Sequence, residues 1–148
     1  MAATSVDAVK WAAEQGFSMM MDPHSSIDDI HEKRQVYDRT LAEHGHEVDN
    51  RDIPVARLLA IAETEEQARR VAESGAQWTT GGYAKPIAGG FDPVARYVDE
   101  VIIWGTPERV AEQLLQYEEE KQLGYLLCAP LSNQSFTLFN DQVRRRIS

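Results

Sequence analysis

Two spacings of apolar residues alternate along the chain. Short, almost continuous apolar runs occur at Phe17–Met21, Val55–Ala62 and Tyr125–Leu131, as is typical of strands that are buried on both faces. Around them, apolar residues recur at the three- and four-residue spacing of helices over 6–15, 27–43, 64–74, 107–123 and 136–147. This alternation predicts an α/β fold with about three parallel strands.

Capping residues fix several helix boundaries. Ser5 precedes the first apolar stripe and Gly16 follows it, which predicts an N-cap and a C-terminal stop. Thr106-Pro107-Glu108 is another helix start, with an N-cap, a proline in the first turn and an acidic residue beside the positive end of the helix dipole.

Residues 75–100 break the alternation. Five glycines and two prolines lie between positions 75 and 93, and we expect a flexible loop insertion over 75–100 with a short helix near 93–98. Residues 1–148 as a whole have the size of a single domain.

Composition narrows the function classes. The net charge of −9 argues against nucleic acid and anionic membranes as partners, since both bind basic surfaces. Cys128 is the sole cysteine, so an internal disulfide is excluded and the reducing cytoplasm is the expected location. Polar residues interrupt the longest uncharged stretch, 125–140, so it is not expected to span a membrane.

Three local signatures follow one another in a particular order. The first signature is Ala3-Thr4-Ser5, followed by the segment from Val9 to Phe17. Leu58–Ala62 then leads into Glu63-Thr64-Glu65-Glu66. Trp104-Gly105-Thr106-Pro107-Glu108 is followed by Gly124-Tyr125-Leu126-Leu127-Cys128. This series resembles the second half of the bacterial luciferase-like monooxygenase superfamily, whose members use reduced FMN or coenzyme F420.

The resemblance implies the C-terminal part of a TIM-like (β/α)₈ barrel. Complete barrels of this kind need about 250 residues, so the three apolar runs would be strands six to eight of an incomplete barrel. The implied chemistry is flavin-dependent oxidation of a small organic substrate. Much of the flavin pocket would lie in the other half, so the catalytic residues are unknown, and activity would need a homo-oligomer or completion by another chain.

A hydroxyl-capped helix start is the candidate cofactor site. The N-terminus of a helix offers free N–H groups and a positive dipole to anions. In the resembled family the corresponding turn holds the flavin phosphate, which implies Thr4, Ser5 and Val6 as cofactor-binding residues. The alternative is that Ser5 only caps the helix.

Met20, Met21 and His24 lie at the end of a predicted barrel strand, and active sites of such barrels lie at that edge. They are candidates for lining the flavin or substrate pocket. The alternatives are that the methionines fill the barrel and that His24 is an exposed loop residue. His44 and His46 are not joined by a second ligand pair, so no metal site is predicted.

Three hypotheses for function remain open at this stage. The chain is a flavin-dependent oxidoreductase completed by other residues, or a non-catalytic truncated homologue that acts as a dimeric or partner subunit. A third possibility is an unrelated small α/β binding protein with a self-sufficient sheet. Three strands with open edges must pair or aggregate, which is why the first two hypotheses both require a partner.

Overall fold

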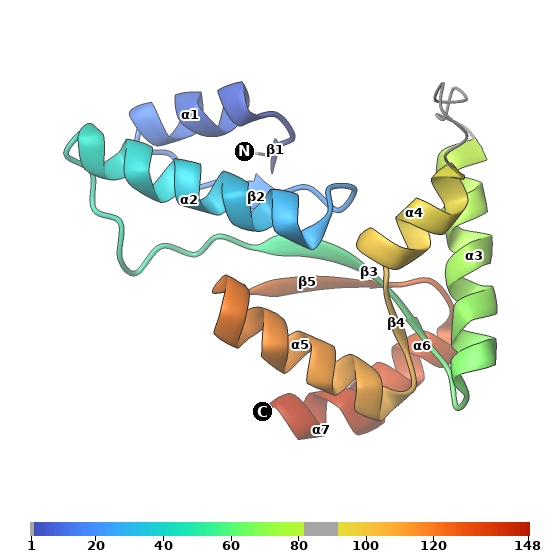
Figure 1. Ribbon diagram of the computed structural model, residues 1–148. Coiled ribbons are helices and arrows are strands. Elements are labelled where there is room, and N and C mark those ends of the chain that lie inside the picture. The colour runs from blue at the N-terminus through green and yellow to red at the C-terminus, as the bar shows by residue number, and fades with distance from the viewer. Residues whose placement is uncertain (1, 82–91) are drawn as a thin grey trace.

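The computed structural model describes residues 2–81 and 92–148 of the chain (Figure 1). Strands and helices alternate along these residues, as the sequence predicts. In chain order the elements are β1 (Ala2–Ala3), α1 (Val6–Glu14), β2 (Met20–Met21), α2 (Ile27–Glu43), β3 (Val55–Ile61), α3 (Glu65–Gly81), α4 (Pro93–Glu100), β4 (Ile103–Gly105), α5 (Pro107–Lys121), β5 (Leu126–Pro130), α6 (Asn133–Leu138), the π-helical turn η1 (Phe139–Val143) and α7 (Arg144–Ile147).

Strand β3 organises a sheet whose pairs are all parallel. Val55 pairs with Met21 of β2 and with Leu126 of β5, so β2 and β5 lie on opposite edges of β3. At the other end of β3, Leu59 pairs with Ile103 of β4 and with Pro130 of β5. Strands β2 and β4 therefore share one edge of β3, one at its start and one at its end, and β1 continues the sheet beyond β2.

The predicted strands are present, with different lengths. Only Met20–Met21 of the run Phe17–Met21 pairs as a strand, whereas β3 and β5 fill most of their predicted ranges. Strand β4 lies at the short apolar run near Trp104. Strand β1 was not predicted, because two alanines carry no measurable periodicity.

The loop predicted over 75–100 is wrong at its start, whereas the short helix expected near 93–98 is present as α4. Helix α3 continues to Gly81 and α4 occupies Pro93–Glu100, while residues 82–91 lie outside the described part of the chain. Gly75 lies inside α3 and does not end it. Its lack of a side chain allows a close contact with another part of the chain. A Cβ added there would come within 2.7 Å of the Leu131 side chain. The small residues Ala68, Ala72 and Ala76 continue the helical spacing and are all buried.

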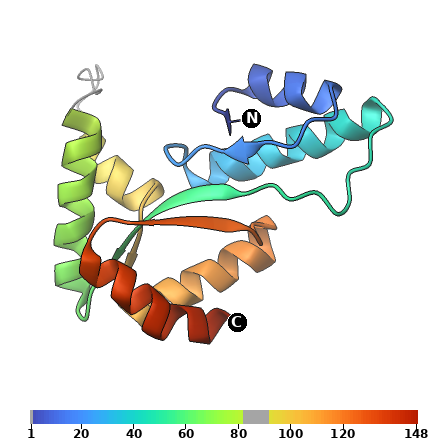
Figure 2. The ribbon, with the colours of Figure 1, turned by 180° about the vertical axis from the view of Figure 1, so that it is seen from behind.

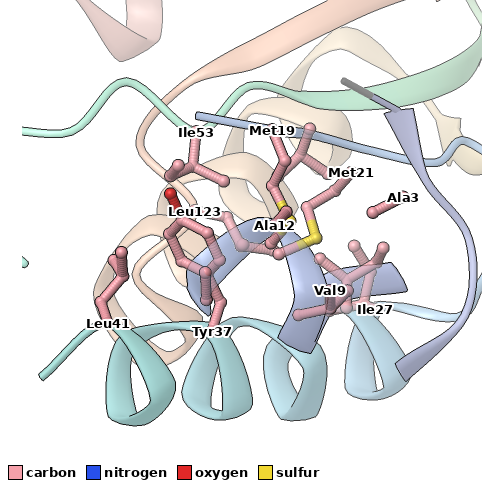
Figure 3. Close-up of a cluster of buried hydrophobic side chains, with 13 residues drawn as sticks. Ala3, Val9, Ala12, Met19, Met21, Ile27, Tyr37, Leu41, Ile53 and Leu123 are labelled. Carbon is pink, nitrogen blue, oxygen red and sulfur yellow. The ribbon is translucent and has the colours of Figure 1, made fainter. Parts of the chain in front are cut away.

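Three apolar clusters hold the elements together. The first joins β1, β2 and the start of β3 to α1 and α2, with Met19, Met21 and Tyr37 at its centre (Figure 3). Its one buried hydroxyl is satisfied, because Tyr37 Oη donates a hydrogen bond of 2.8 Å to the Phe17 carbonyl. The packing therefore fixes both helices against the N-terminal part of the sheet.

The other two clusters cover opposite faces of β3. Leu59 and Ile61 pack against α5, α6 and η1, whereas Ala60 and the half-buried Leu58 pack against α3 and α4. Figures 1 and 2 show these two helical groups on either side of the strand. Within the described residues, no helix is long and apolar enough to cross a membrane.

One face of β5 is not covered by the described residues. Leu126 and Cys128 pack against the α5 side, but Tyr125 is 46% exposed and Leu127 is 39% exposed. Because side chains alternate along a strand, Leu127 lies on the same face of the sheet as Ala56 and Leu58 of β3.

Leu59→Ala should lower the free energy of unfolding by about 2–5 kcal/mol, because a fully buried leucine leaves a cavity when truncated. Urea unfolding followed by circular dichroism measures the change. The control is Leu115→Ala on α5, where the side chain is 43% exposed and the expected change is about 0.5 kcal/mol or less. Equal losses in the two variants would contradict the central position of β3.

Candidate functional site

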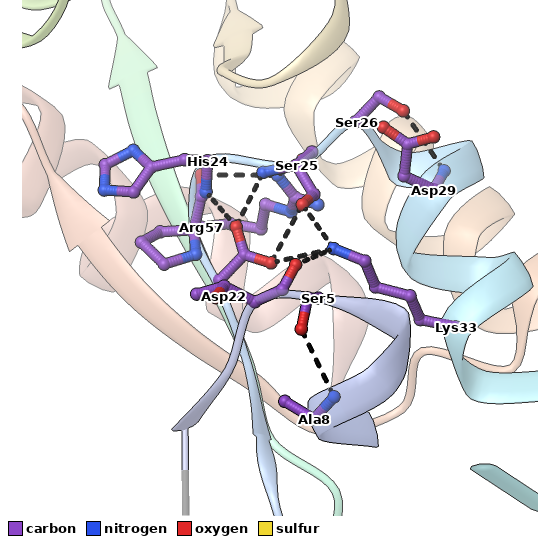
Figure 4. Close-up of polar contacts among 11 residues, drawn as sticks. Ser5, Ala8, Asp22, His24, Ser25, Ser26, Asp29, Lys33 and Arg57 are labelled. Atoms are coloured by element: carbon purple, nitrogen blue, oxygen red, sulfur yellow. Dashed lines mark hydrogen bonds and ion pairs between the residues drawn. The ribbon is translucent and has the colours of Figure 1, made fainter. Parts of the chain in front are cut away.

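The carboxyl ends of the parallel strands gather the candidate residues at one edge of the sheet. Thr4 and Ser5 follow β1, and the turn 22–26 follows β2. In parallel α/β structures, binding sites form at this edge. The structure thus brings Ser5 and His24, which are far apart in sequence, to the same edge of the fold (Figure 4).

Ser5 caps helix α1 as predicted. Its backbone is extended, and its Oγ accepts a hydrogen bond of 3.2 Å from the Ala8 N–H group. The first intrahelical bond runs from the Val9 N–H to the Ser5 carbonyl, at 3.0 Å. The N–H groups of Val6 and Asp7 precede that bond, as at every helix start. Val6 is 44% exposed, so the first turn of α1 lies at the surface.

Asp22 organises the turn that follows β2. Its Oδ1 accepts hydrogen bonds from the N–H groups of His24 at 2.9 Å and Ser25 at 2.8 Å. Its Oδ2 accepts a third bond of 2.8 Å from Ser25 Oγ. With 6% of its side chain exposed, the carboxylate is a buried anchor for the turn.

Lys33 connects this turn to the start of α1. From the first half of α2, its Nζ donates to Ser25 Oγ and to the Thr4 carbonyl, each at 2.8 Å, and to Asp22 Oδ2 at 3.3 Å. Its side chain is 10% exposed. A buried ammonium group is therefore hydrogen-bonded to Thr4, the residue that precedes Ser5 (Figure 4).

Arg57 in β3 is the second buried cation. It is 0% exposed, and its Nη1 donates to the carbonyls of Ser25 at 2.6 Å, Val101 at 3.4 Å and Pro23 at 3.5 Å. Its Nε and Nη2 have no hydrogen-bond partner within the described part of the chain. Burial lowers the pKa of Arg57 and the Asp22 charge raises it, but a guanidinium keeps its proton in proteins.

The buried charges do not balance. Among the described residues, the charged side chains that are buried are Asp22, Lys33 and Arg57, which leaves two cations against one carboxylate. Burial alone would raise the pKa of Asp22, but hydrogen bonds from Ser25 and the His24 N–H group, together with the Lys33 charge, hold it below its ordinary value. An unpaired buried charge is costly, and Arg57 is the cation without a carboxylate partner, since Lys33 pairs with Asp22 at 3.3 Å.

His24 faces a different part of the edge. Its ring extends away from the Asp22–Lys33 group (Figure 4), and its Nδ1 is hydrogen-bonded to the Tyr97 hydroxyl of α4. Together with α4 and the end of α3, it lines a cavity of about 480 Å³. The lining residues are His24, Thr80, Pro93, Arg96, Tyr97, Glu100 and Val101.

The other candidate residues do not lie together at one site. Met21 is 0% exposed and packs in the cluster against α1 and α2. It therefore fills the core, which was the alternative to a place in the flavin or substrate pocket. Met20 points to the opposite face and is half-buried. Cys128 is surrounded by apolar groups, and burial raises the pKa of its thiol to about 11, which suppresses the reactive thiolate.

Lys33 and Arg57 were not among the residues proposed from sequence. Arg57 carried a usable signal, because it is the one charged residue inside the run Val55–Ala62, and a charge in a buried strand needs a specific role. Lys33 gave no comparable signal, because a lysine on a helix rich in charged residues is ordinarily exposed.

The Asp22→Asn variant should lose part of the pH dependence of stability. The pKa of Asp22 is lower in the folded than in the unfolded chain, so its stabilising effect is complete above about pH 4 and disappears as pH falls through the folded-state pKa. At neutral pH the variant should be about 3 kcal/mol less stable, and this difference should narrow below about pH 4.

Chemical denaturation at a series of pH values measures that difference. Asp99→Asn on α4 serves as the control, since Asp99 is exposed and should show no pH-dependent difference from wild type. A gap between wild type and Asp22→Asn that stays constant across the acid range would contradict the assigned role of the carboxylate.

Comparison with known proteins gives one family and one fold. The model of the family described as luciferase-like monooxygenase matches residues 1–121. No curated protein sequence matches the chain.

Solved structures match nearly the whole chain. The oxygenating constituent of 3,6-diketocamphane monooxygenase from Pseudomonas putida, in complex with FMN, has a TM-score of 0.72 at 23% identity, over 99% of this chain and 48% of that chain. An F420-dependent secondary alcohol dehydrogenase has a TM-score of 0.72 at 9% identity, over 99% and 48%. The F420-dependent tetrahydromethanopterin reductase from Methanopyrus kandleri has a TM-score of 0.66 at 16% identity, over 100% and 50%.

The chain therefore spans about half the length of these structures. Its parallel sheet and covering helices correspond to part of a TIM-like barrel, as the sequence predicted. Because the family model covers most of the chain and the fold agrees with it, the chain belongs to the luciferase-like monooxygenase family.

Proposed function

We propose that the chain forms part of a flavin-dependent oxidoreductase and holds the phosphate of FMN or F420 at the start of α1. The observation that carries this proposal is a serine-capped helix N-terminus whose preceding residue, Thr4, accepts a hydrogen bond from the buried ammonium group of Lys33. The phosphate would accept hydrogen bonds from the backbone of Val6 and from Ser5, with Thr4 beside it.

The donors at this end of α1 fit a phosphate group. The N–H groups of Val6 and Asp7 precede the first intrahelical bond, and a helix N-terminus adds a partial positive charge. Lys33 donates a hydrogen bond of 2.8 Å to the Thr4 carbonyl. This bond fixes the backbone at Thr4 and brings a full positive charge close to the start of α1. Asp7 is exposed, so its carboxylate can turn toward solvent.

When bound, the flavin would supply the redox chemistry, since proteins leave such steps to cofactors. The residues of this chain would bind the phosphate end, orient the ring and exclude water from one side. Met20 of β2 is half-buried and lies outside the apolar cluster that holds Met21, and its apolar side chain suits contact with a flavin ring or a small organic substrate.

Turnover would need more polypeptide than these residues. The chain spans about half the length of the matched structures, and the exposed side chains of Tyr125 and Leu127 mark a sheet face that another surface would cover. We propose that a second copy or another chain completes the barrel. The single cysteine makes the cytoplasm the proposed compartment.

The same exposed face supports a second candidate function. A chain that pairs through Tyr125 and Leu127 without binding flavin would be a non-catalytic partner subunit. The two candidates differ in flavin affinity, whereas both require association.

The proposed site predicts that Ser5→Asp will weaken FMN binding about fivefold to thirtyfold. Aspartate still caps a helix but places a negative charge where the phosphate would lie. Titration of FMN, F420 and riboflavin, followed by flavin fluorescence, measures the effect, with the solution mass of the chain recorded in the same buffer.

Two controls make this titration specific. Riboflavin lacks the phosphate, so its affinity should be the same for wild type and Ser5→Asp. Ser132→Asp introduces the same change at the N-cap of α6 and should leave FMN affinity unchanged. Failure of both FMN and F420 to bind wild type at millimolar concentration would overturn the cofactor proposal and favour the partner-subunit function.

A further inference from the structure

The cavity beside His24 has the size and lining of a small-molecule site. It lies between the turn after β2 and helices α3 and α4, with a volume of about 480 Å³, and ligand pockets generally fall between about 300 and 1,000 Å³. Pro93, Val101 and the ring of Tyr97 give it apolar walls. Such walls suit the hydrocarbon part of an organic molecule.

The His24 ring lines this cavity, and its Nδ1 is hydrogen-bonded to the Tyr97 hydroxyl. Tyr97 is part of the α3–α4 cluster, and its burial raises the pKa of the phenol, so the hydroxyl keeps its proton. When this hydroxyl donates to Nδ1 of His24, the neutral imidazole carries its own hydrogen on Nε2. In this arrangement Tyr97 determines which nitrogen of the ring is the donor.

The charged groups at the cavity are already paired with each other. Arg96 Nε donates to Glu100 Oε2 at 3.0 Å, one turn apart on α4, and both side chains are about half exposed. Thr80 donates its hydroxyl hydrogen to the Ala76 carbonyl at 2.8 Å, which leaves its oxygen as an acceptor. The cavity therefore suits an uncharged ligand better than an anion, in contrast to the start of α1.

A single buried side chain ties the two walls together. Arg57 Nη1 contacts the carbonyls of Pro23 and Ser25, which flank His24, and the carbonyl of Val101 at the end of α4. The turn and the helix are thus held to one rigid point in β3. Sites supported in this way are preorganised for binding.

We propose that this cavity binds a small, uncharged organic molecule through a carbonyl or hydroxyl oxygen that accepts a hydrogen bond from His24 Nε2, with Tyr97 as a positioning residue. The inference rests on the proposed function at one point: the flavin-dependent function would make the bound molecule the substrate. Binding itself needs no flavin, so the two proposals can fail separately.

Cyclohexanone is a suitable probe, because it is compact, uncharged and has one acceptor oxygen. Its binding to the 148-residue chain, without flavin, is followed by ligand-observed NMR and by the ¹⁵N signals of the histidine rings at about pH 8, where an imidazole is ordinarily neutral. His24→Phe keeps a planar ring but removes the donor, and Tyr97→Phe removes only the hydroxyl. His44→Phe, at the exposed C-cap of α2, is the matched control.

We expect cyclohexanone to shift the Nε2 signal of His24 and to bind about threefold to tenfold more weakly to His24→Phe than to His44→Phe. Tyr97→Phe should change the proportion of the two ring tautomers of His24 and weaken binding to a smaller extent. These changes would not follow if Tyr97 only filled space.

Several outcomes would overturn the inference. They are the absence of cyclohexanone binding to wild type, equal binding by His24→Phe and His44→Phe, and a His24 ring whose hydrogen stays on Nδ1 in the presence of Tyr97. None of these bears on FMN binding at Ser5. Conversely, a chain that binds cyclohexanone at His24 but no flavin would refute the proposed function and keep this site.

Discussion

The burial of two cations with one carboxylate is the constraint on which the functional edge of this fold depends. Asp22 accepts hydrogen bonds from its own turn and from Lys33, while Arg57 holds the carbonyls of that turn from the neighbouring strand. Each group is hidden from water, where a charge is stable only when it is well partnered. The backbone between Thr4 and Ser26 is therefore held more firmly than an ordinary surface loop.

This network gives the two ends of the site different chemistry. Lys33, which is paired with Asp22, places a buried positive charge at the Thr4 carbonyl, next to the start of α1. Arg57 donates hydrogen bonds to backbone carbonyls next to the cavity. The charged side chains that line the cavity pair with each other. One end of the edge is thus suited to an anion and the other to an uncharged oxygen, as a cofactor phosphate and an organic substrate would require.

Much of the fold follows from the sequence, because apolar spacing and capping residues determine local structure. Ser5 and Thr106 cap the helices as predicted, and the runs at Val55 and Tyr125 contain strands. The errors have physical causes. Gly75 suggested a loop, but the lack of a side chain serves a tight contact with Leu131 inside a helix, and a sequence does not distinguish these two uses of glycine.

The site was less accessible to prediction than the fold. Ser5 could be proposed because it precedes a helical apolar stripe, and His24 because it follows an apolar run closely. Their supporting residues could not, because Lys33 reaches Thr4 across 29 positions and Tyr97 reaches His24 across 73. Such contacts depend on how α2 and α4 pack on the sheet, and no local pattern encodes them.

A crystal structure of the chain with FMN would test the central claim most directly, namely that the serine-capped start of α1, beside the buried Lys33, is an anion site. We predict that the phosphate will lie on the backbone N–H of Val6 and the hydroxyl of Ser5, with Asp22 and Lys33 still paired beneath it. A phosphate bound elsewhere, with water alone on the first turn of α1, would contradict the account.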